Sequence, residues 1–318
     1  MSSEESDPEL QYVEVTDNVV TATLYPKEIE GHTLRMYETG TMSCIALKSE
    51  LMFVDCGAIV KDARRFREDM ETRFQKPTTH LFLTHDHYHC TYGMIAFEDV
   101  TVVSSSVCQS YFRKNFKKGV SDRRKEGILR AFPDDERLRE SILENALFIP
   151  QIGVRAQSEQ LFGEEDQVAF RSCRGHSAAS GYIYVPNEKV LFTGGNLNSC
   201  YAQMIVPLAT VEVYRTWESL DIDFVVPGHG SIVDKSYISR IREYFEQLLH
   251  KLRELKPEGL SAEQVVNRND LPEYPHKGKN WTEGSQYHTQ AVDWLVKYWY
   301  GRVLKETRVE DDDLMFIS

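Results

Sequence analysis

Three histidines fall close together in the segment formed by residues 84–90. His85, His87 and His89 alternate, and alternate side chains of an extended segment point to the same side. Neutral imidazole is a common zinc ligand, and three imidazoles around one ion leave a fourth position for water. An ion held in this way can generate hydroxide near neutral pH. The spacing therefore predicts a metal site that activates water.

Two further histidines lie beside glycines, in the sequences Gly175-His176-Ser177 and Gly228-His229-Gly230. Glycine allows the backbone to turn tightly, so both rings could be aimed at a common centre. A short histidine-rich tract can also bind metal only incidentally. The two additional histidines favour a metal centre that is assembled from several loops.

The surrounding pattern predicts strands and helices that place these histidines at strand ends. The apolar runs at residues 80–83 and 224–226 directly precede the segments with His85 and His229, and active sites of layered α/β folds favour such positions. Further strands are expected at residues 19–24, 41–47, 51–54, 100–103, 167–171, 182–185 and 189–192, and helices at 63–75, 211–220, 237–255 and around 294–299.

The length of 318 residues allows one α/β domain, which we expect at residues 15–305. A flexible N-terminal arm at 1–14 and an acidic tail at 306–318 would flank it. Within the domain, residues 106–147 are expected to form a mostly helical cover, with a helix entry at Pro133, and residues 236–305 to form C-terminal helices.

The formal net charge of −12 disfavours a nucleic-acid partner, because such proteins usually present a basic face. The basic residues between Arg113 and Lys125 are typical of a solvated helix face. No run is long and apolar enough to span a membrane, and six scattered cysteines fit reduced thiols. We expect a cytoplasmic protein that acts on a small molecule. A homodimer is possible.

Five motifs, taken in order, resemble those of the metallo-β-lactamase superfamily. They are FVDCG at residues 53–57, THDHYHC at 84–90, GHS at 175–177, LFTGG at 191–195 and VPGHG at 226–230. The resemblance covers residues 15–300 and implies an α/β fold, the four-layer αβ/βα sandwich, with the metals held between the edges of its two sheets.

By this resemblance, His85, His87 and His176 match the three histidines of the first metal site, and His229 matches a histidine of the second. The family's His-x-His-x-Asp-His motif is altered, because His89 and Cys90 stand where the second metal takes an aspartate and a histidine. The carboxylate that bridges both metals is also missing, since Gly195 and then Asn196 follow Gly194.

The altered motif has two interpretations. His89, Cys90 and His229 could form a softer second set, because thiolate and imidazole both suit zinc. Alternatively, Cys90 is a small buried thiol and His89 a supporting or solvent-facing ring. The loss of both carboxylates favours one tightly held Zn²⁺, with a second ion weak or absent, and it argues against iron dioxygenase chemistry.

The resemblance and the ligands together predict a zinc-dependent hydrolase of a small ester, thioester, lactone or lactam. His89 would replace the missing aspartate as base, and Tyr88 or Asn196 would stabilise an oxyanion. The alternative is a metal-binding or regulatory protein without turnover, since fold does not fix function. Cleavage of nucleic acid is the least favoured function, because the chain is acidic.

Overall fold

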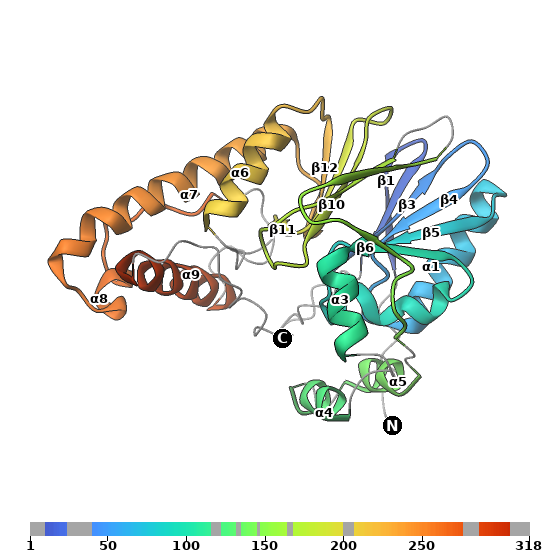
Figure 1. Ribbon diagram of the computed structural model, residues 1–318, viewed down its shortest axis with the longest axis horizontal. Coiled ribbons are helices and arrows are strands. Elements are labelled where there is room, and N and C mark those ends of the chain that lie inside the picture. Colours follow the sequence, from blue (N-terminus) through green and yellow to red (C-terminus); the bar gives the residue numbers. More distant parts are fainter. Residues whose placement is uncertain are drawn as a thin grey trace, which may run out of the picture.

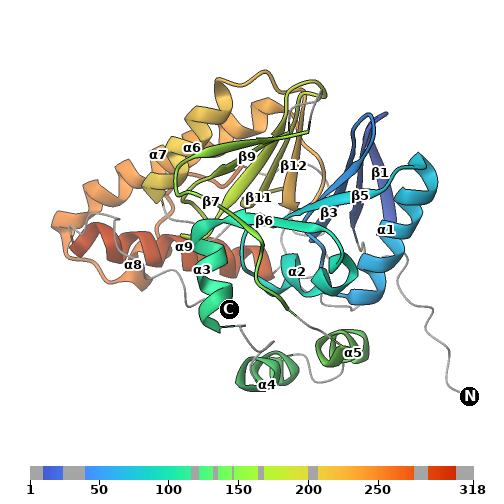
Figure 2. The same ribbon diagram turned by 45° about the vertical axis from the view of Figure 1, so that its right-hand side comes forward.

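The computed structural model describes residues 10–23, 40–115, 122–131, 135–144, 147–163, 168–199, 207–275 and 286–305. Two β-sheets lie face to face at its centre, and helices cover their outer faces (Figure 1). Figures 1 and 2 place α6, α7 and α9 on one flank of the paired sheets and α1 on the other.

The first sheet has seven strands in the order in which they occur along the chain. They are β1 (Gln11–Thr16), β2 (Val19–Thr23), β3 (Thr41–Ala46), β4 (Leu51–Val54), β5 (Thr78–Phe82), β6 (Thr101–Ser105) and β7 (Ile152–Val154). The pairs from β1 to β4 are antiparallel, and those from β4 to β7 are parallel. Parallel neighbours need crossover connections, which here carry α1 and the histidine segment.

The second sheet has five strands in the order β12-β11-β10-β9-β8. They are β8 (Glu159–Phe162), β9 (Val168–Ser172), β10 (Gly181–Val185), β11 (Val190–Asn198) and β12 (Phe224–His229). Strands β8 to β11 pair antiparallel, whereas β11 and β12 are parallel. Strand β12 therefore ends on the same edge as β11 and delivers His229 there.

Helices complete the outer layers. Those beside the first sheet are α1 (Val60–Phe74), α2 (Tyr88–Thr91), the 3₁₀ helix η2 (Tyr92–Phe97), α3 (Ser106–Asn115), α4 (Asp122–Ala131) and α5 (Glu136–Glu144). Those beside the second are α6 (Pro207–Glu218), α7 (Lys235–Leu255), η3 (Lys256–Glu258), α8 (Ala262–Val266) and α9 (Gln286–Lys305). In the described part of the chain, no helix is long and apolar enough to span a membrane.

Three hydrophobic cores separate the four layers. One core lies between the first sheet and its helices and contains Phe53 and Phe66. The second lies between the other sheet and α6, α7 and α9, with Trp217 and Trp299 fully buried. The third joins the facing sides of the two sheets. This layering confirms the predicted αβ/βα sandwich.

The expected amphipathic helix at residues 237–255 is α7, which begins two residues earlier at Lys235. Its apolar positions, spaced by three and four residues, are buried and face the second sheet. They are Ile238, Ile241, Phe245, Leu248, Leu252 and Leu255. A helix packs one apolar stripe against a core, and this pattern is readable in the sequence.

The prediction of a flexible arm through residue 14 is wrong for residues 11–14, which belong to strand β1. The first four residues of β1 are exposed, so burial does not alternate along the strand as it does in a half-buried strand. Its place comes from antiparallel pairing, in which Tyr12 lies opposite Ala22. Residues 1–9 and the acidic tail at 306–318 lie outside the described part.

The segment at residues 106–147 contains the three helices α3, α4 and α5. Arg137 of α5 donates two 2.8 Å hydrogen bonds to the carboxylate of Asp62 in α1. The Ser141 hydroxyl accepts a hydrogen bond from the Val60 amide and donates one to the Ala58 carbonyl. Helix α5 is thus fastened to the start of α1. The expected helix entry at Pro133 lies outside the described residues.

Candidate metal centre

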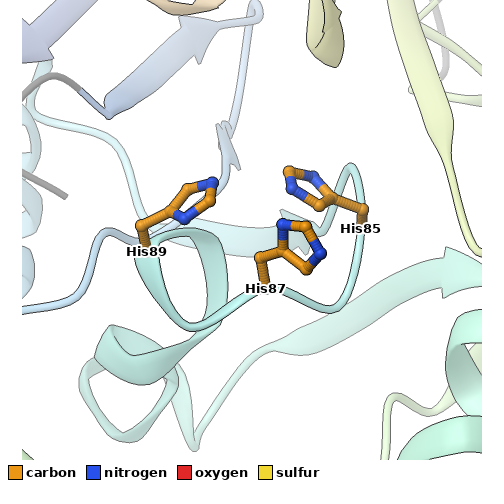
Figure 3. A group of neighbouring side chains, drawn as sticks. All are labelled: His85, His87 and His89. Atoms are coloured by element: carbon orange, nitrogen blue, oxygen red, sulfur yellow. The ribbon is translucent and has the colours of Figure 1, made fainter. Parts of the chain in front are cut away.

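The histidine segment leaves the first sheet at the end of β5 and enters the short helix α2. His85 and His87 lie in the connecting loop, and His89 lies inside the helix. The expectation of one extended segment is therefore wrong for His89, whose direction is set by a helical turn. Figure 3 nevertheless shows the three rings gathered around one space. Each offers a ligand nitrogen, and these nitrogens lie within 4.8 Å of one another.

The second sheet contributes His176 and His229 to the same group. His176 lies in the loop between β9 and β10, and its Nε2 is 3.1 Å from Nδ1 of His87. His229 ends β12, and its Nε2 is 3.1 Å from Nε2 of His89. The ring of His85 lies 4.6 Å from that of His87 and 5.0 Å from that of His176. Five imidazoles from both sheets therefore form one continuous group.

This arrangement fits a metal ion. Two nitrogens bound to one tetrahedral zinc, each about 2.0–2.1 Å from it, lie roughly 3.3 Å apart. The 3.1 Å between His87 Nδ1 and His176 Nε2 is close to that separation. Nδ1 of His89 is buried and lacks a hydrogen-bond partner among the described residues. Burial first, and the neighbouring histidines second, lower the pKa of His85 and of His89, so both rings stay neutral and can bind a metal.

Asp55 and Thr84 hold His85 from behind. The Asp55 carboxylate accepts hydrogen bonds from the Thr84 amide at 2.8 Å and from its hydroxyl at 2.7 Å. Because that hydroxyl gives its proton to Asp55, it accepts one from Nδ1 of His85, which lies 3.0 Å away. This chain of hydrogen bonds leaves the Nε2 lone pair of His85 for a metal.

Asp55 itself occupies an unusual position. Its backbone is left-handed, with φ of 54°, and its side chain is almost completely buried. Burial raises the pKa of this carboxyl to about 7, although the hydrogen bonds from Thr84 oppose the shift. Asp55 and Thr84 both lie in the motifs that carry the family resemblance, at residues 53–57 and 84–90. Their hydrogen bonds behind His85 were not predicted from the sequence.

Cys90 lies behind His85 rather than among the imidazoles. Its sulfur is 3.6 Å from Nδ1 of His85 and 3.9 Å from Nε2, so it is nearer to the side that faces Thr84. Burial, together with Asp55 and Cys56, raises the pKa of the Cys90 thiol well above its usual range. These contacts favour the buried-thiol interpretation of Cys90 over the ligand interpretation.

The side chain of Asn196 is buried and makes contacts inside the protein. Its side chain is 1% exposed, and its Oδ1 accepts a 2.8 Å hydrogen bond from the His176 amide. Its Nδ2 contacts the sulfur of Cys173 at 3.5 Å. Both ends of the amide thus make contacts inside the protein, which favours a supporting role for Asn196. The oxyanion role of Asn196 stays a prediction.

Tyr88 packs its ring beside His89 and Tyr92, with centroid distances of 5.5 and 5.9 Å. The ring is half-buried against the core of the first sheet. Packing therefore accounts for the aromatic ring of Tyr88. An oxyanion role for its hydroxyl stays a prediction.

The missing carboxylates leave a centre made of imidazoles. Among the described residues, His85, His87 and His89 have ligand atoms that all lie within 4.8 Å of one another, and His176 and His229 each approach one of them to 3.1 Å. At Gly195, an added Cβ would lie 2.5 Å from Cδ2 of His176. The ring of His176 thus occupies the space that the Cβ of any other residue at position 195 would need.

No family model and no curated protein matches the sequence. Solved structures do match. A metallo-β-lactamase from Pontibacter korlensis is 17% identical, with a TM-score of 0.51 over 75% of this chain and 99% of the other. The DIM-1 metallo-β-lactamase is 15% identical, with a TM-score of 0.52 over 75% and 97%.

A double mutant of the sec-alkyl sulfatase PisA1 is also 15% identical, with a TM-score of 0.63. That match covers 93% of this chain but only 50% of the sulfatase, so the chain spans half of its length. These similarities agree with the two facing sheets and their outer helices. The chain therefore has the fold of the metallo-β-lactamase superfamily.

Proposed function

We propose that this protein is a zinc-dependent hydrolase of a small ester, thioester, lactone or lactam. The observation that carries the proposal is the approach of His87 Nδ1 to His176 Nε2, which brings ligands from the two sheets within 3.1 Å. Proteins of the same fold bear the names metallo-β-lactamase and alkyl sulfatase, which supports a hydrolytic reaction.

His85, His87 and His176 would hold the ion, with Nε2 of His85 left available by the hydrogen bond of its Nδ1. Imidazole suits zinc, whereas magnesium, calcium and manganese prefer carboxylate and carbonyl oxygens. When bound, zinc polarises a carbonyl and lowers the pKa of a coordinated water to about 7.

His89 and His229 face each other through their Nε2 atoms at 3.1 Å. They offer two imidazoles and no carboxylate, which is a weak set for a second divalent ion. We therefore propose that one ring donates its N–H to the other. In this arrangement the pair holds a proton beside the reacting group and orients water, which is the role first expected of His89.

A metal-binding protein without turnover is the second candidate. The packing of His176 against Gly195 favours it, because the position of the family's bridging carboxylate is closed. Such a protein would keep the metal and lose the reaction.

Hydrolysis by the zinc-loaded protein separates the two candidates. Ester, thioester, lactone and lactam substrates would be offered to wild type, to His85→Ala and to His250→Ala. His250 is 77% exposed on α7 and serves as a matched histidine control. We expect turnover that is lost in His85→Ala and kept in His250→Ala. A complete lack of His85-dependent turnover, with zinc bound, would support the binding protein instead.

A further inference from the structure

Asn196 connects strand β11 to the loop that carries His176. Its Oδ1 accepts the His176 N–H at 2.8 Å, so the hydrogen bond ends on the backbone of the histidine itself. Its Nδ2 contacts the Cys173 sulfur at the end of the preceding strand, at 3.5 Å. One buried amide therefore fixes two points of the loop.

Asn196 is in turn held by the second core. The hydroxyl of Tyr214, a fully buried residue of α6, donates a 2.6 Å hydrogen bond to the Asn196 carbonyl. Tyr214 also packs against Trp217, with a centroid distance of 5.3 Å. The support beneath His176 thus extends from β11 into the packed helix layer.

Two glycines make this arrangement sterically possible. A Cβ on Gly175 would lie 2.1 Å from Oδ1 of Asn196, and a Cβ on Gly195 would lie 2.5 Å from Cδ2 of His176. Real Cβ atoms are not found this close to other heavy atoms. Asn196, next to Gly195, fills the space beside Gly175. His176, next to Gly175, fills the space beside Gly195, so the loop and the strand pack closely against each other.

We propose that Asn196 is a positioning residue that sets the metal-binding geometry of His176. The family resemblance implied a metal-binding carboxylate after Gly194. In this chain Asn196 of that stretch supports the ligand His176 and does not itself bind the metal. The inference rests on the metal centre proposed above, in which His176 is the ligand that the second sheet contributes to the first metal. Groups that orient a ligand commonly change metal affinity by about 10–100-fold when they are lost.

Zinc affinity of four variants tests the proposal, measured by competition with a chromophoric chelator. Asn196→Leu keeps the size of the side chain but removes the acceptor, and Gly175→Ala pushes on the same acceptor from the other side. We expect both to weaken zinc binding by about 10–100-fold. Asn196→Asp retains the oxygen, and Cys173→Ala removes only the sulfur contact. These two should stay within about threefold of wild type, because the hydrogen bond to His176 persists.

Two further readouts separate positioning from a general structural role. The visible absorption spectrum of bound Co²⁺ should change in Asn196→Leu and Gly175→Ala, because it reports the ligand geometry. Thermal unfolding of the metal-free proteins measures stability alone. Asn196→Leu with lower metal-free stability but unchanged zinc affinity and Co²⁺ spectrum would overturn the inference.

If Asn196→Leu does not fold, the zinc affinities of Gly175→Ala and Cys173→Ala are compared instead. Equal zinc affinity in these two variants would refute the proposal. A wild-type chain that binds no zinc overturns the metal centre, and the inference with it. If wild type binds zinc and Asn196→Leu binds it equally tightly, the positioning role of Asn196 is overturned while the metal centre stands.

Discussion

The imidazole of His176 lies against the backbone of Gly195, at the place where any side chain there would begin. The separation of 2.5 Å between an added Cβ and Cδ2 of the ring is far below van der Waals contact. The presence of glycine at position 195 and the direction of the His176 ring therefore depend on each other.

Gly195→Asp should not create a second metal site. Because the new side chain must displace His176, we expect zinc affinity to fall by at least about tenfold, as expected when ligand orientation is lost. Gly195→Ala is the matched control, since it adds the Cβ without the charge and should show a similar loss. Metal content and affinity of both proteins check this. Two tightly bound ions in Gly195→Asp would contradict it.

Wild type should hold one tightly bound zinc per chain, and Cys90→Ala should hold the same amount. The Cys90 sulfur lies on the Nδ1 side of His85, next to Thr84 and Asp55, and does not join the imidazoles. Elemental analysis after dialysis measures the stoichiometry, with His87→Ala as the variant expected to lose the ion. A drop in metal content in Cys90→Ala would show that the thiol is a ligand.

The buried thiols should be inert in the native protein at pH 8. Burial raises the pKa of Cys44, Cys56, Cys90, Cys108 and Cys173, the last to about 12. A higher pKa lowers the thiolate fraction at a given pH, and the thiolate is the reactive form. Alkylation followed by mass spectrometry should label none of these five before unfolding and all of them afterwards. Rapid native labelling of Cys90 would contradict this. Cys200 lies outside the described residues.

Phe53→Ala should destabilise the protein by about 3–5 kcal/mol, the usual cost of removing a buried phenylalanine. Its ring is 1% exposed and lies 5.4 Å from Phe66 and 5.1 Å from Phe97, centroid to centroid. Leu143→Ala is the control, because Leu143 is 66% exposed on α5 and should change stability by less than about 0.5 kcal/mol. Denaturant unfolding of both variants gives the comparison. A similar loss in both would argue against this core.

The spacing of apolar residues along the sequence predicted many of the strands and helices. Strand β4 was predicted at its observed bounds, and the spacing of apolar residues predicted α7 to within two residues. Strand β1 was missed because its first four residues are exposed, and only its pairing with β2 defines it. Helix α2 was missed because four residues are too short to show a helical period.

The sequence by itself determined which residues could bind a metal, because imidazole chemistry belongs to the residue type and the motifs with His85, His176 and His229 indicated the fold. Only the tertiary structure decided how they meet. His87 and His176 are 89 residues apart in sequence, and His89 and His229 are 140 apart, yet each pair approaches to 3.1 Å. It also decided that Asn196 points to the His176 backbone and that Cys90 stays behind His85. The direction of a side chain in a loop depends on contacts with distant segments, and no local pattern encodes them.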